Sequence, residues 1–139
     1  GKHSKGPGVV LRLAGIYGPG RLPRVTDIRE NKPIPADPDS WLNLIHVDDA
    51  VSVICDISEL PSPENLYVVS DTTPLRRKEW YSSLAEFTNS PPPRWAAEAP
   101  RMRGGNKRVN SSCIWKDLQK QPNHPNAIDA MKILLQQSS

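Results

Sequence analysis

The sequence predicts an α/β fold in which this chain supplies part of a parallel sheet. Two short apolar runs, at residues 8–15 and 66–70, have the composition of strands that are covered on both faces in such a sheet. Between them, residues 46–60 repeat apolar side chains at helical spacing. A strand, a helix and a parallel strand form a right-handed crossover unit. Because two strands leave unpaired edges, we expect neighbouring strands to complete the sheet.

Composition sets limits on the interior of the molecule. The chain has 139 residues, the length of one ordinary domain, but only 37% of them are hydrophobic and only one is Phe. Its 15 prolines add irregular surface. These values indicate a small core and favour a chain that forms part of a larger protein.

Cellular context follows from what the sequence lacks. No stretch reaches the roughly 18 apolar residues of a membrane span, and no secretory leader is present, so we expect a cytoplasmic protein with no membrane partner. Cys55 and Cys113 are too few for a disulfide framework and are expected to be free thiols. The histidines and cysteines lack zinc-binding spacing, and no metal site is predicted.

The first predicted strand, GVVLRLAG, ends abruptly in the turn YGPG, at residues 17–20. Arg12 is the one charge that interrupts it. In open α/β sheets, ligands collect at the carboxyl ends of parallel strands. This turn is therefore the first candidate for a binding site.

The segment that follows is predicted to be irregular. Residues 22–31 place Leu22, Val25 and Ile28 three apart, which favours a short amphipathic helix. Residues 31–40 contain three prolines and are predicted to be a loop, and 41–45 have strand character.

The helix at residues 46–60 is predicted to bury Ala50, Val53, Ile54 and Ile57. Asp48 and Asp49 lie in its first turn, where negative charge is stabilising; a catalytic or metal-binding role is the alternative. His46, between two apolar residues, is either a packed, hydrogen-bonded side chain or a ligand.

After the second strand, Thr73 is predicted to cap a helix that has Pro74 in its first turn and that continues to Phe87. Trp80, Leu84 and Phe87 share one face of it. Asn110 or Ser111 is expected to cap a short helical turn. A closing helix at residues 126–137 places Ile128, Met131 and Leu135 on one side.

Residues 101–108, RMRGGNKR, carry four positive charges and no acid. A solvated loop is the simplest interpretation, and the alternative is that Arg101, Arg103, Lys107 and Arg108 contact an anionic ligand such as a phosphate. The net charge of the chain is only +3. A nucleic-acid interface is therefore the least favoured function.

Three motifs in this order resemble the C-terminal half of the extended short-chain dehydrogenase/reductase family, the NAD-dependent epimerase/dehydratases. They are GIYGPGR at the end of the first strand, IHVDDA opening a helix, and LYVVSDTTP, which contains the second strand and opens another helix. The likeness extends from Val9 to Leu135. It implies the C-terminal portion of a Rossmann-like doubly wound parallel sheet, with a small substrate-binding lobe at residues 17–47 and 90–126.

The resemblance also implies roles for particular residues. The segment that leaves the first strand would pass beneath the nicotinamide of NAD or NADP, so the cofactor contacts would come from Leu13, Ala14, Gly15 and Ile16. Substrate contacts would come from Tyr17, Gly18 and His46, with Tyr17 and Gly18 shaping the pocket floor. Apart from the resemblance, Lys107 and Arg108 of the basic segment are candidates for contact with an anionic part of the substrate. For YGPG, a simple turn without a binding role is the alternative.

Two departures from the family pattern concern the substrate. Members that act on nucleotide diphosphate sugars commonly have asparagine where this chain has Gly15, and arginine where it has Leu42. Losing a charge-assisted bond to a phosphate removes roughly 1.5 to 3 kcal/mol of binding free energy. A nucleotide sugar is therefore not assured as the substrate.

The catalytic elements of the family are absent from this sequence. It has no glycine-rich turn for the pyrophosphate. The family also pairs a tyrosine with a lysine four residues later, whereas Tyr17, Tyr67 and Tyr81 are followed at that spacing by Arg21, Asp71 and Ala85. No catalytic residue is therefore assigned.

We expect this chain to be the substrate-binding half of an NAD(P)-dependent epimerase/dehydratase or reductase-like protein. Its partners would be a small-molecule substrate and the N-terminal half of the same protein, or another chain at the open sheet edge. The alternative is a non-catalytic module that binds a small molecule or a protein. The sequence specifies neither the substrate, nor NAD against NADP, nor the oligomeric state.

Overall fold

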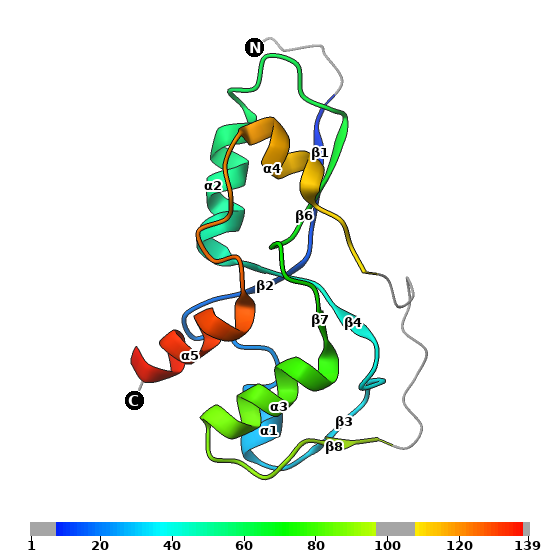
Figure 1. Cartoon of the computed structure of the whole chain (residues 1–139), viewed down its shortest axis with the longest axis vertical. Coiled ribbons are helices and arrows are strands. Elements are labelled where there is room, and N and C mark those ends of the chain that lie inside the picture. The colour runs from blue at the N-terminus through cyan, green and yellow to red at the C-terminus, as the bar shows by residue number, and fades with distance from the viewer. Residues whose placement is uncertain (1–7, 97–107, 138–139) are drawn as a thin grey trace.

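The computed structural model describes residues 8–96 and 108–137, which form two regions joined by short strands (Figure 1). The sheet region holds β1 (Val10–Leu13), β6 (Leu66–Val69), α2 (Val47–Ile57) and α4 (Ser112–Leu118). Its core consists of Ile45, Ala50, Val53, Tyr67, Val69, Ile114 and Trp115. The lobe holds α1 (Val25–Arg29), α3 (Arg77–Phe87) and α5 (Ala127–Gln137). Its larger core is centred on Tyr17, Ile28, Ile34, Trp80, Leu84 and Met131.

The central prediction of the sequence analysis, a parallel strand pair, is confirmed. Strand β1 (Val10–Leu13) pairs in parallel with β6 (Leu66–Val69), with Val10 opposite Leu66 and Leu13 opposite Val69. Helix α2 (Val47–Ile57) lies in the connection between them (Figure 1). Because both strands run the same way, their carboxyl ends meet where the sheet region joins the lobe.

The predicted strand at residues 8–15 is in fact two consecutive strands, and the second of them extends to Tyr17. After Leu13 the chain exchanges one partner for another, because the Ala14 N–H bonds to the Val69 carbonyl at 2.9 Å and the Gly15 N–H to the Asn43 carbonyl at 3.0 Å. Strand β2 (Gly15–Tyr17) then pairs in parallel with β5 (Leu44–His46). The GIY of the GIYGPG motif is therefore strand, and only the residues after Tyr17 turn.

The pairing of the short strands in the lobe was not predicted, but strands do form at Trp41–Leu42 and Leu44–His46, where residues 41–45 were expected to have strand character. Strand β3 (Pro33–Ile34) pairs in parallel with β8 (Arg94–Trp95), within the segment expected to be a loop. Strand β4 (Trp41–Leu42) pairs antiparallel with β7 (Leu75–Arg76). Helix α1 (Val25–Arg29) forms within the predicted range and buries Ile28.

The predicted start of the next helix is wrong. Helix α3 (Arg77–Phe87) begins after β7, so Thr73 and Pro74 precede a strand and cap nothing. The backbone N–H of Arg76 instead bonds to Oε1 of Glu79 at 2.8 Å. Strand pairing with β4 extends these residues and delays the helix.

The two C-terminal helices follow their predicted positions. Helix α4 is Ser112–Leu118 and α5 is Ala127–Gln137. Asn110 Oδ1 accepts the Ser112 N–H at 2.9 Å, and Asn126 Oδ1 accepts the Ile128 N–H at 2.9 Å. Asparagine side chains thus satisfy free backbone donors at the start of each helix.

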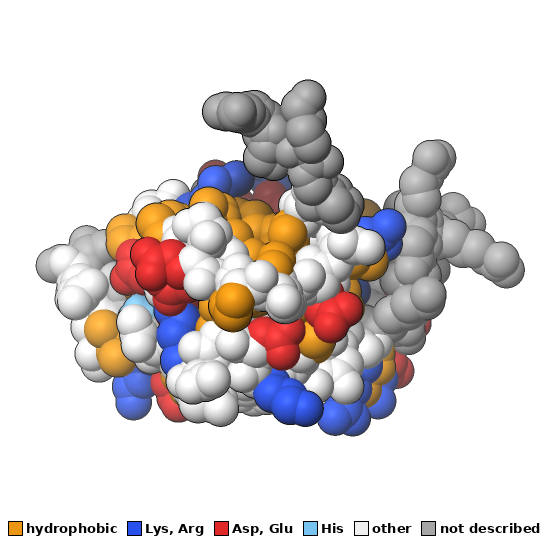
Figure 2. All heavy atoms as spheres, turned by 90° about the horizontal axis from the view of Figure 1, so that it is seen from above, with side chains coloured by type: hydrophobic (Ala, Val, Ile, Leu, Met, Phe, Trp, Pro, Cys, Tyr) orange, Lys and Arg blue, Asp and Glu red, His pale blue; other side chains and the backbone are white. Residues whose placement is uncertain are grey.

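One face of the β1–β6 pair is bare within the described residues. Tyr67 and Val69 lie beneath α2 and α4, but on the other face Val10 is 54% exposed and Leu66 45%. Apolar side chains also gather at the end of the molecule seen from above in Figure 2. The described residues therefore do not supply the cover that was expected on this face of the strands. Ile54, predicted to be buried, is 50% exposed.

Among the described residues, no helix is long and apolar enough to cross a bilayer.

Candidate functional site

The candidate site lies where β1, β6, β2 and β5 meet at the boundary between the two regions. The chain leaves β6 through Ser70 and Asp71, and the Asp71 N–H bonds to the Leu44 carbonyl at 2.8 Å. Helix α2 begins directly after His46 of β5. The carboxyl ends of parallel strands therefore bring Tyr17, His46 and Asp71 to one edge, as expected for ligand sites in open α/β sheets.

Asp71 is a buried carboxyl group that is only half paired. Its Oδ1 accepts the Thr73 N–H at 3.0 Å, whereas Oδ2 has no hydrogen-bond partner among the described atoms. Burial raises the pKa of Asp71 to about 7; the Thr73 hydrogen bond opposes this rise and the negative charge of Asp49 adds to it. This carboxyl can therefore hold or release a proton near neutral pH.

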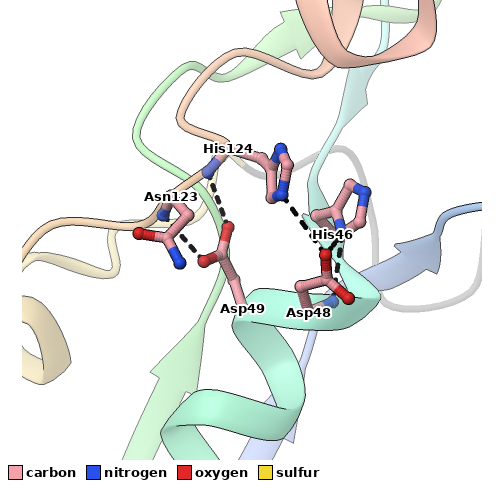
Figure 3. Close-up of polar contacts among 5 residues, drawn as sticks. All are labelled: His46, Asp48, Asp49, Asn123 and His124. Atoms are coloured by element: carbon pink, nitrogen blue, oxygen red, sulfur yellow. Dashed lines mark hydrogen bonds and ion pairs between the residues drawn. The ribbon is translucent and has the colours of Figure 1, made fainter. Parts of the chain in front are cut away.

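Asp49 fastens the lobe to the sheet region. It is 2% exposed, and its two carboxylate oxygens accept the backbone N–H groups of Asn123 at 2.7 Å and of His124 at 2.9 Å (Figure 3). Both bonds cross from the first turn of α2 to the segment that precedes α5. The two neighbouring aspartates thus differ in role: Asp48 is exposed in the first turn of α2, whereas Asp49 is buried and holds the segment before α5.

His46 caps α2 and packs against a second imidazole. Its Nδ1 accepts the Asp48 N–H at 3.0 Å, and its ring stacks on His124 with centroids 3.7 Å apart and planes 16° apart (Figure 3). Burial lowers the pKa of His46, the nearby His124 lowers it further, and the charges of Asp48 and Asp49 oppose both effects. The packed and hydrogen-bonded interpretation of His46 is therefore the one that its contacts support.

The same cluster contains metal-ligand atoms that the sequence spacing did not reveal. The nitrogens of His46 and His124 and a carboxylate oxygen of Asp48 lie within 4.8 Å of one another. Asp48 Oδ2 is 3.7 Å from His46 Nδ1 and 3.5 Å from His124 Nε2. Stacked rings direct their nitrogen lone pairs in parallel, so the two imidazoles would have to open before sharing one ion. As it stands, the cluster caps a helix.

Tyr17 lies behind this edge, within the core of the lobe. It is fully buried and packs edge-on against His46, at 5.1 Å between ring centroids, and against Trp80, at 5.8 Å. Its hydroxyl has no partner among the described atoms. Burial raises the pKa of Tyr17, and the charges of Asp71 and Asp49 raise it further. The hydroxyl therefore stays protonated at neutral pH.

A polar pocket of about 410 Å³ opens beside Asp71, and we call it the β6-edge pocket. It is lined by residues from the end of β6 and the start of α4: Asp71, Thr72, Pro74, Arg108, Val109, Asn110, Ser111 and Ser112. The guanidinium of Arg108 lies 5.8 Å from the centre of the Trp41 ring. The buried Ser111 hydroxyl donates to the Ser70 carbonyl at 3.0 Å and so fixes the wall.

The structure distributes the predicted site residues over this edge. Leu13 ends β1, Ala14 links the two strands, and Gly15, Ile16 and Tyr17 form β2. Gly18 follows directly, and a Cβ added there would lie 2.7 Å from Val47 Cγ1, so a side chain would collide with the start of α2. Arg108 lines the β6-edge pocket. Lys107 and the rest of the basic segment 101–107 lie outside the described residues.

Sequence reasoning missed Asp71 and His124 as members of the site. Asp71 was noted only within a motif and as the residue four places after Tyr67. Its position directly after a predicted strand was the available signal. His124 had no local signal, because its contact with His46 depends on the path of the chain after α4.

Comparison with known proteins shows which proteins this geometry resembles. No family model matches the chain. A short-chain dehydrogenase/reductase, family 42E member 1, from Danio rerio is 34% identical over 89 residues, which are 55% of this chain and 23% of that protein. A solved structure from Methylobacillus flagellatus, described as an NAD-dependent epimerase/dehydratase, is 28% identical with a TM-score of 0.74. The aligned region covers 94% of this chain and 47% of the Methylobacillus flagellatus chain.

The resemblance to the extended short-chain dehydrogenase/reductase family is confirmed. A structure of a conserved protein of unknown function from Silicibacter pomeroyi agrees, at 28% identity and a TM-score of 0.77 over 96% of this chain. The Rossmann-like α/β fold class is confirmed with it. This chain spans about half the length of each of these two solved proteins. It spans less than half the length of the curated relatives that it matches.

More distant neighbours share the fold and show which cofactors accompany it. A UDP-glucuronic acid 4-epimerase from Bacillus cereus, solved with UDP-glucuronic acid and NAD, is 18% identical with a TM-score of 0.66 and covers 96% of this chain and 46% of its own. A Pseudomonas aeruginosa protein, RMD, solved with NADPH, is 13% identical with a TM-score of 0.66 and covers 92% and 46%. Nicotinamide dinucleotides are thus bound by proteins of this fold.

Proposed function

We propose that this chain is the substrate-binding half of an NAD(P)-dependent epimerase/dehydratase or reductase-like protein. The preceding half of the same polypeptide would supply the glycine-rich turn and the catalytic tyrosine and lysine. The observation that carries the proposal is the incomplete sheet: β1 and β6 are parallel, and among the described residues one face of the pair is covered and the other is bare. A Rossmann-like sheet needs helices over that face and further strands at its edges.

The residues at the carboxyl edge have separate roles in this proposal. Leu13, Ala14, Gly15 and Ile16 would lie against the nicotinamide end of the cofactor. Tyr17 and His46, which are buried, would support the substrate pocket from behind, and Gly18 would let the chain turn close to α2. The carboxyl edge of the sheet, where all of them lie, is where ligands bind in open α/β folds.

The β6-edge pocket is the proposed substrate-side pocket. Its volume of about 410 Å³ suits a small molecule. Arg108 supplies a cation for an anionic group of the substrate, with Lys107 beside it in the sequence. Because Asp71 can release a proton near neutral pH, it would set the pH range in which the pocket accepts a hydrogen-bond donor.

The first test is the coding sequence immediately upstream of Gly1. The proposal expects it to encode a glycine-rich strand-to-helix turn, followed later by a tyrosine with a lysine four residues on. An initiation codon directly before Gly1 would instead favour the alternative, a remnant that binds a small molecule or another chain without catalysing a reaction.

The second test joins the N-terminal half of the Methylobacillus flagellatus protein to this chain and measures NADH and NADPH binding by fluorescence. We expect the joined protein to bind a dinucleotide, and replacement of Val10 and Leu66 by lysine to abolish this binding. The matched control is Ile133→Lys, which changes an equally exposed apolar residue on α5 and should leave binding intact. Equal binding with and without the lysines at Val10 and Leu66 would contradict the proposed sheet completion.

A further inference from the structure

A second cavity lies in the lobe, formed by the turn after β2, by α1 and by the end of α5. We call it the arginine pocket. Its volume is about 430 Å³, and its lining includes Arg21, Leu22, Val25, Arg29, Leu134 and Leu135. We propose that the arginine pocket binds a carboxylate with an apolar aliphatic or aromatic body. Neither the predicted cofactor contacts nor the β6-edge pocket shares a residue with it.

The charge of the pocket comes from two arginines that lack side-chain partners among the described residues. The guanidinium groups of Arg21 and Arg29 make no ion pair or hydrogen bond with any described residue, whereas the guanidinium group of the nearby Arg24 pairs with the Asp27 carboxylate at 2.9 Å. An arginine fork matches the two oxygens of a carboxylate, and such bonds are stronger than those between neutral groups. Two guanidinium groups at one cavity, neither of them paired with a described residue, therefore favour an anionic ligand.

The end of α5 does not neutralise this charge. The C-terminus of a helix carries roughly half a negative charge, which attracts nearby cations. Two guanidinium groups carry two positive charges, so a positive excess remains at the cavity even if both approach the last turn of α5. A monovalent anion would bring the local charge close to balance.

The walls of the pocket require that the occupant also has an apolar body. Leu22, Val25, Leu134 and Leu135 are partly buried and pack against the core of the lobe. Sites for small molecules are usually concave and mostly apolar, with a few polar groups that fix orientation. An inorganic ion would leave this apolar surface in contact with water, whereas a carboxylate with an aromatic or aliphatic body would cover it.

The backbone of Arg21, which lines the cavity, is held in a closed turn. Its backbone N–H and carbonyl bond to Gly18 at 2.9 and 3.0 Å, closing the turn. Gly20 within that turn has φ of 71°, a left-handed conformation that favours glycine. Arg29 lies in the last turn of α1. Both cations therefore approach the cavity from supported backbone, which reduces the entropy lost when a ligand binds.

The test measures binding of three probes to the full chain by NMR titration: 3-phenylpropionate, the neutral 3-phenylpropanol, and inorganic phosphate. We expect saturable shifts at the lining residues with 3-phenylpropionate, and binding about tenfold weaker or more for the other two probes. Arg21→Gln and Arg29→Gln should each weaken 3-phenylpropionate binding by a similar factor. Arg12→Gln, which removes an exposed cation of β1, is the matched control and should change nothing.

Three outcomes would overturn the proposal: no saturable binding of 3-phenylpropionate, equal binding of the alcohol or of phosphate, or an equal loss of affinity in Arg12→Gln. If an arginine variant fails to fold, Leu135→Ser tests the same pocket through its apolar wall and should also weaken 3-phenylpropionate binding. Failure of this proposal and failure of the proposed enzyme function can be told apart. Dinucleotide binding is tested through variants of the sheet region, whereas 3-phenylpropionate binding is tested through variants of the lobe.

Discussion

The lobe and the sheet region differ in how completely each buries its own core. In the lobe, Trp80, Leu84 and Met131 are fully buried, and aromatic rings pack edge-on around Tyr17. In the sheet region, Val10, Leu66, Val51 and Ile54 are about half exposed, although β1 and β6 form a regular parallel pair. Among the described residues, the lobe therefore has a closed core, whereas one face of the β1–β6 pair is uncovered. Stability should depend mainly on the lobe, and assembly on the sheet.

The largest expected effect is in the core of the lobe. Trp80→Ala removes a fully buried ring that contacts Tyr17, and it should lower the free energy of unfolding by about 3–5 kcal/mol. Denaturation of the full chain by guanidinium chloride measures this. A loss below about 1 kcal/mol would show that the lobe is not the more closed of the two cores.

The next effect is a pH dependence at the junction of the two regions. Because the pKa of Asp71 is raised to about 7 in the folded chain, the folded state holds a proton that the unfolded state releases near pH 4. The contribution of Asp71 to the free energy of unfolding should therefore fall as pH rises from about 4 to 7, by at most about 4 kcal/mol, and then stay level.

The measurement compares denaturation curves of the wild type and of Asp71→Asn at several pH values. The variant keeps an acceptor for the Thr73 N–H but cannot titrate. We expect the difference between the two proteins to grow in favour of the variant up to pH 7. Parallel pH profiles would mean that the carboxyl has an ordinary pKa.

A smaller effect should follow from releasing the clamp between the regions. Asp49→Asn leaves one oxygen to accept the two N–H groups of Asn123 and His124, so the free energy of unfolding should fall by about 1–3 kcal/mol. Hydrogen exchange at the amides of Asn123 and His124 should accelerate at the same time. Asp48→Asn, at an exposed neighbour, is the control and should leave both amides protected.

The smallest effect is expected on the bare face of the sheet. Val10→Ser and Leu66→Ser replace side chains that already face water, so the free energy of unfolding of this chain should change by no more than about 0.5 kcal/mol. Thermal and chemical denaturation measure this. A loss of several kcal/mol at either position would show that this face is covered within the chain and would remove the contrast with the lobe.

The long elements could be predicted because their patterns are local. A contiguous apolar run specified β1 and β6, and helical spacing specified α2 and α5. Residues 41–45, which contain β4 and most of β5, were predicted to have strand character. The two-residue strands β3, β7 and β8 could not be predicted, because so short a segment shows no period. Strand pairing with Trp41–Leu42 moved the start of α3, and this depends on residues distant in the sequence.

The site was only partly accessible to the same reasoning. The position of Arg108 in a pocket and the edge formed by β2 and β5 agree with where ligands were expected. The residue roles themselves stay predictions, as do the boundaries of the substrate lobe at 17–47 and 90–126. The arginine pocket had no sequence signal, because its lining comes from a turn, from α1 and from the far end of the chain.

The sequence by itself determined the family resemblance, the parallel pair β1–β6 and the helix between them, because each depends on side chains that are neighbours along the chain. Only the tertiary structure decided that Asp49 fastens the tail, that His46 stacks on His124, and that two arginines without a side-chain partner among the described residues share a cavity. Such contacts join segments far apart in the sequence, and burial and pairing there depend on how the whole chain packs.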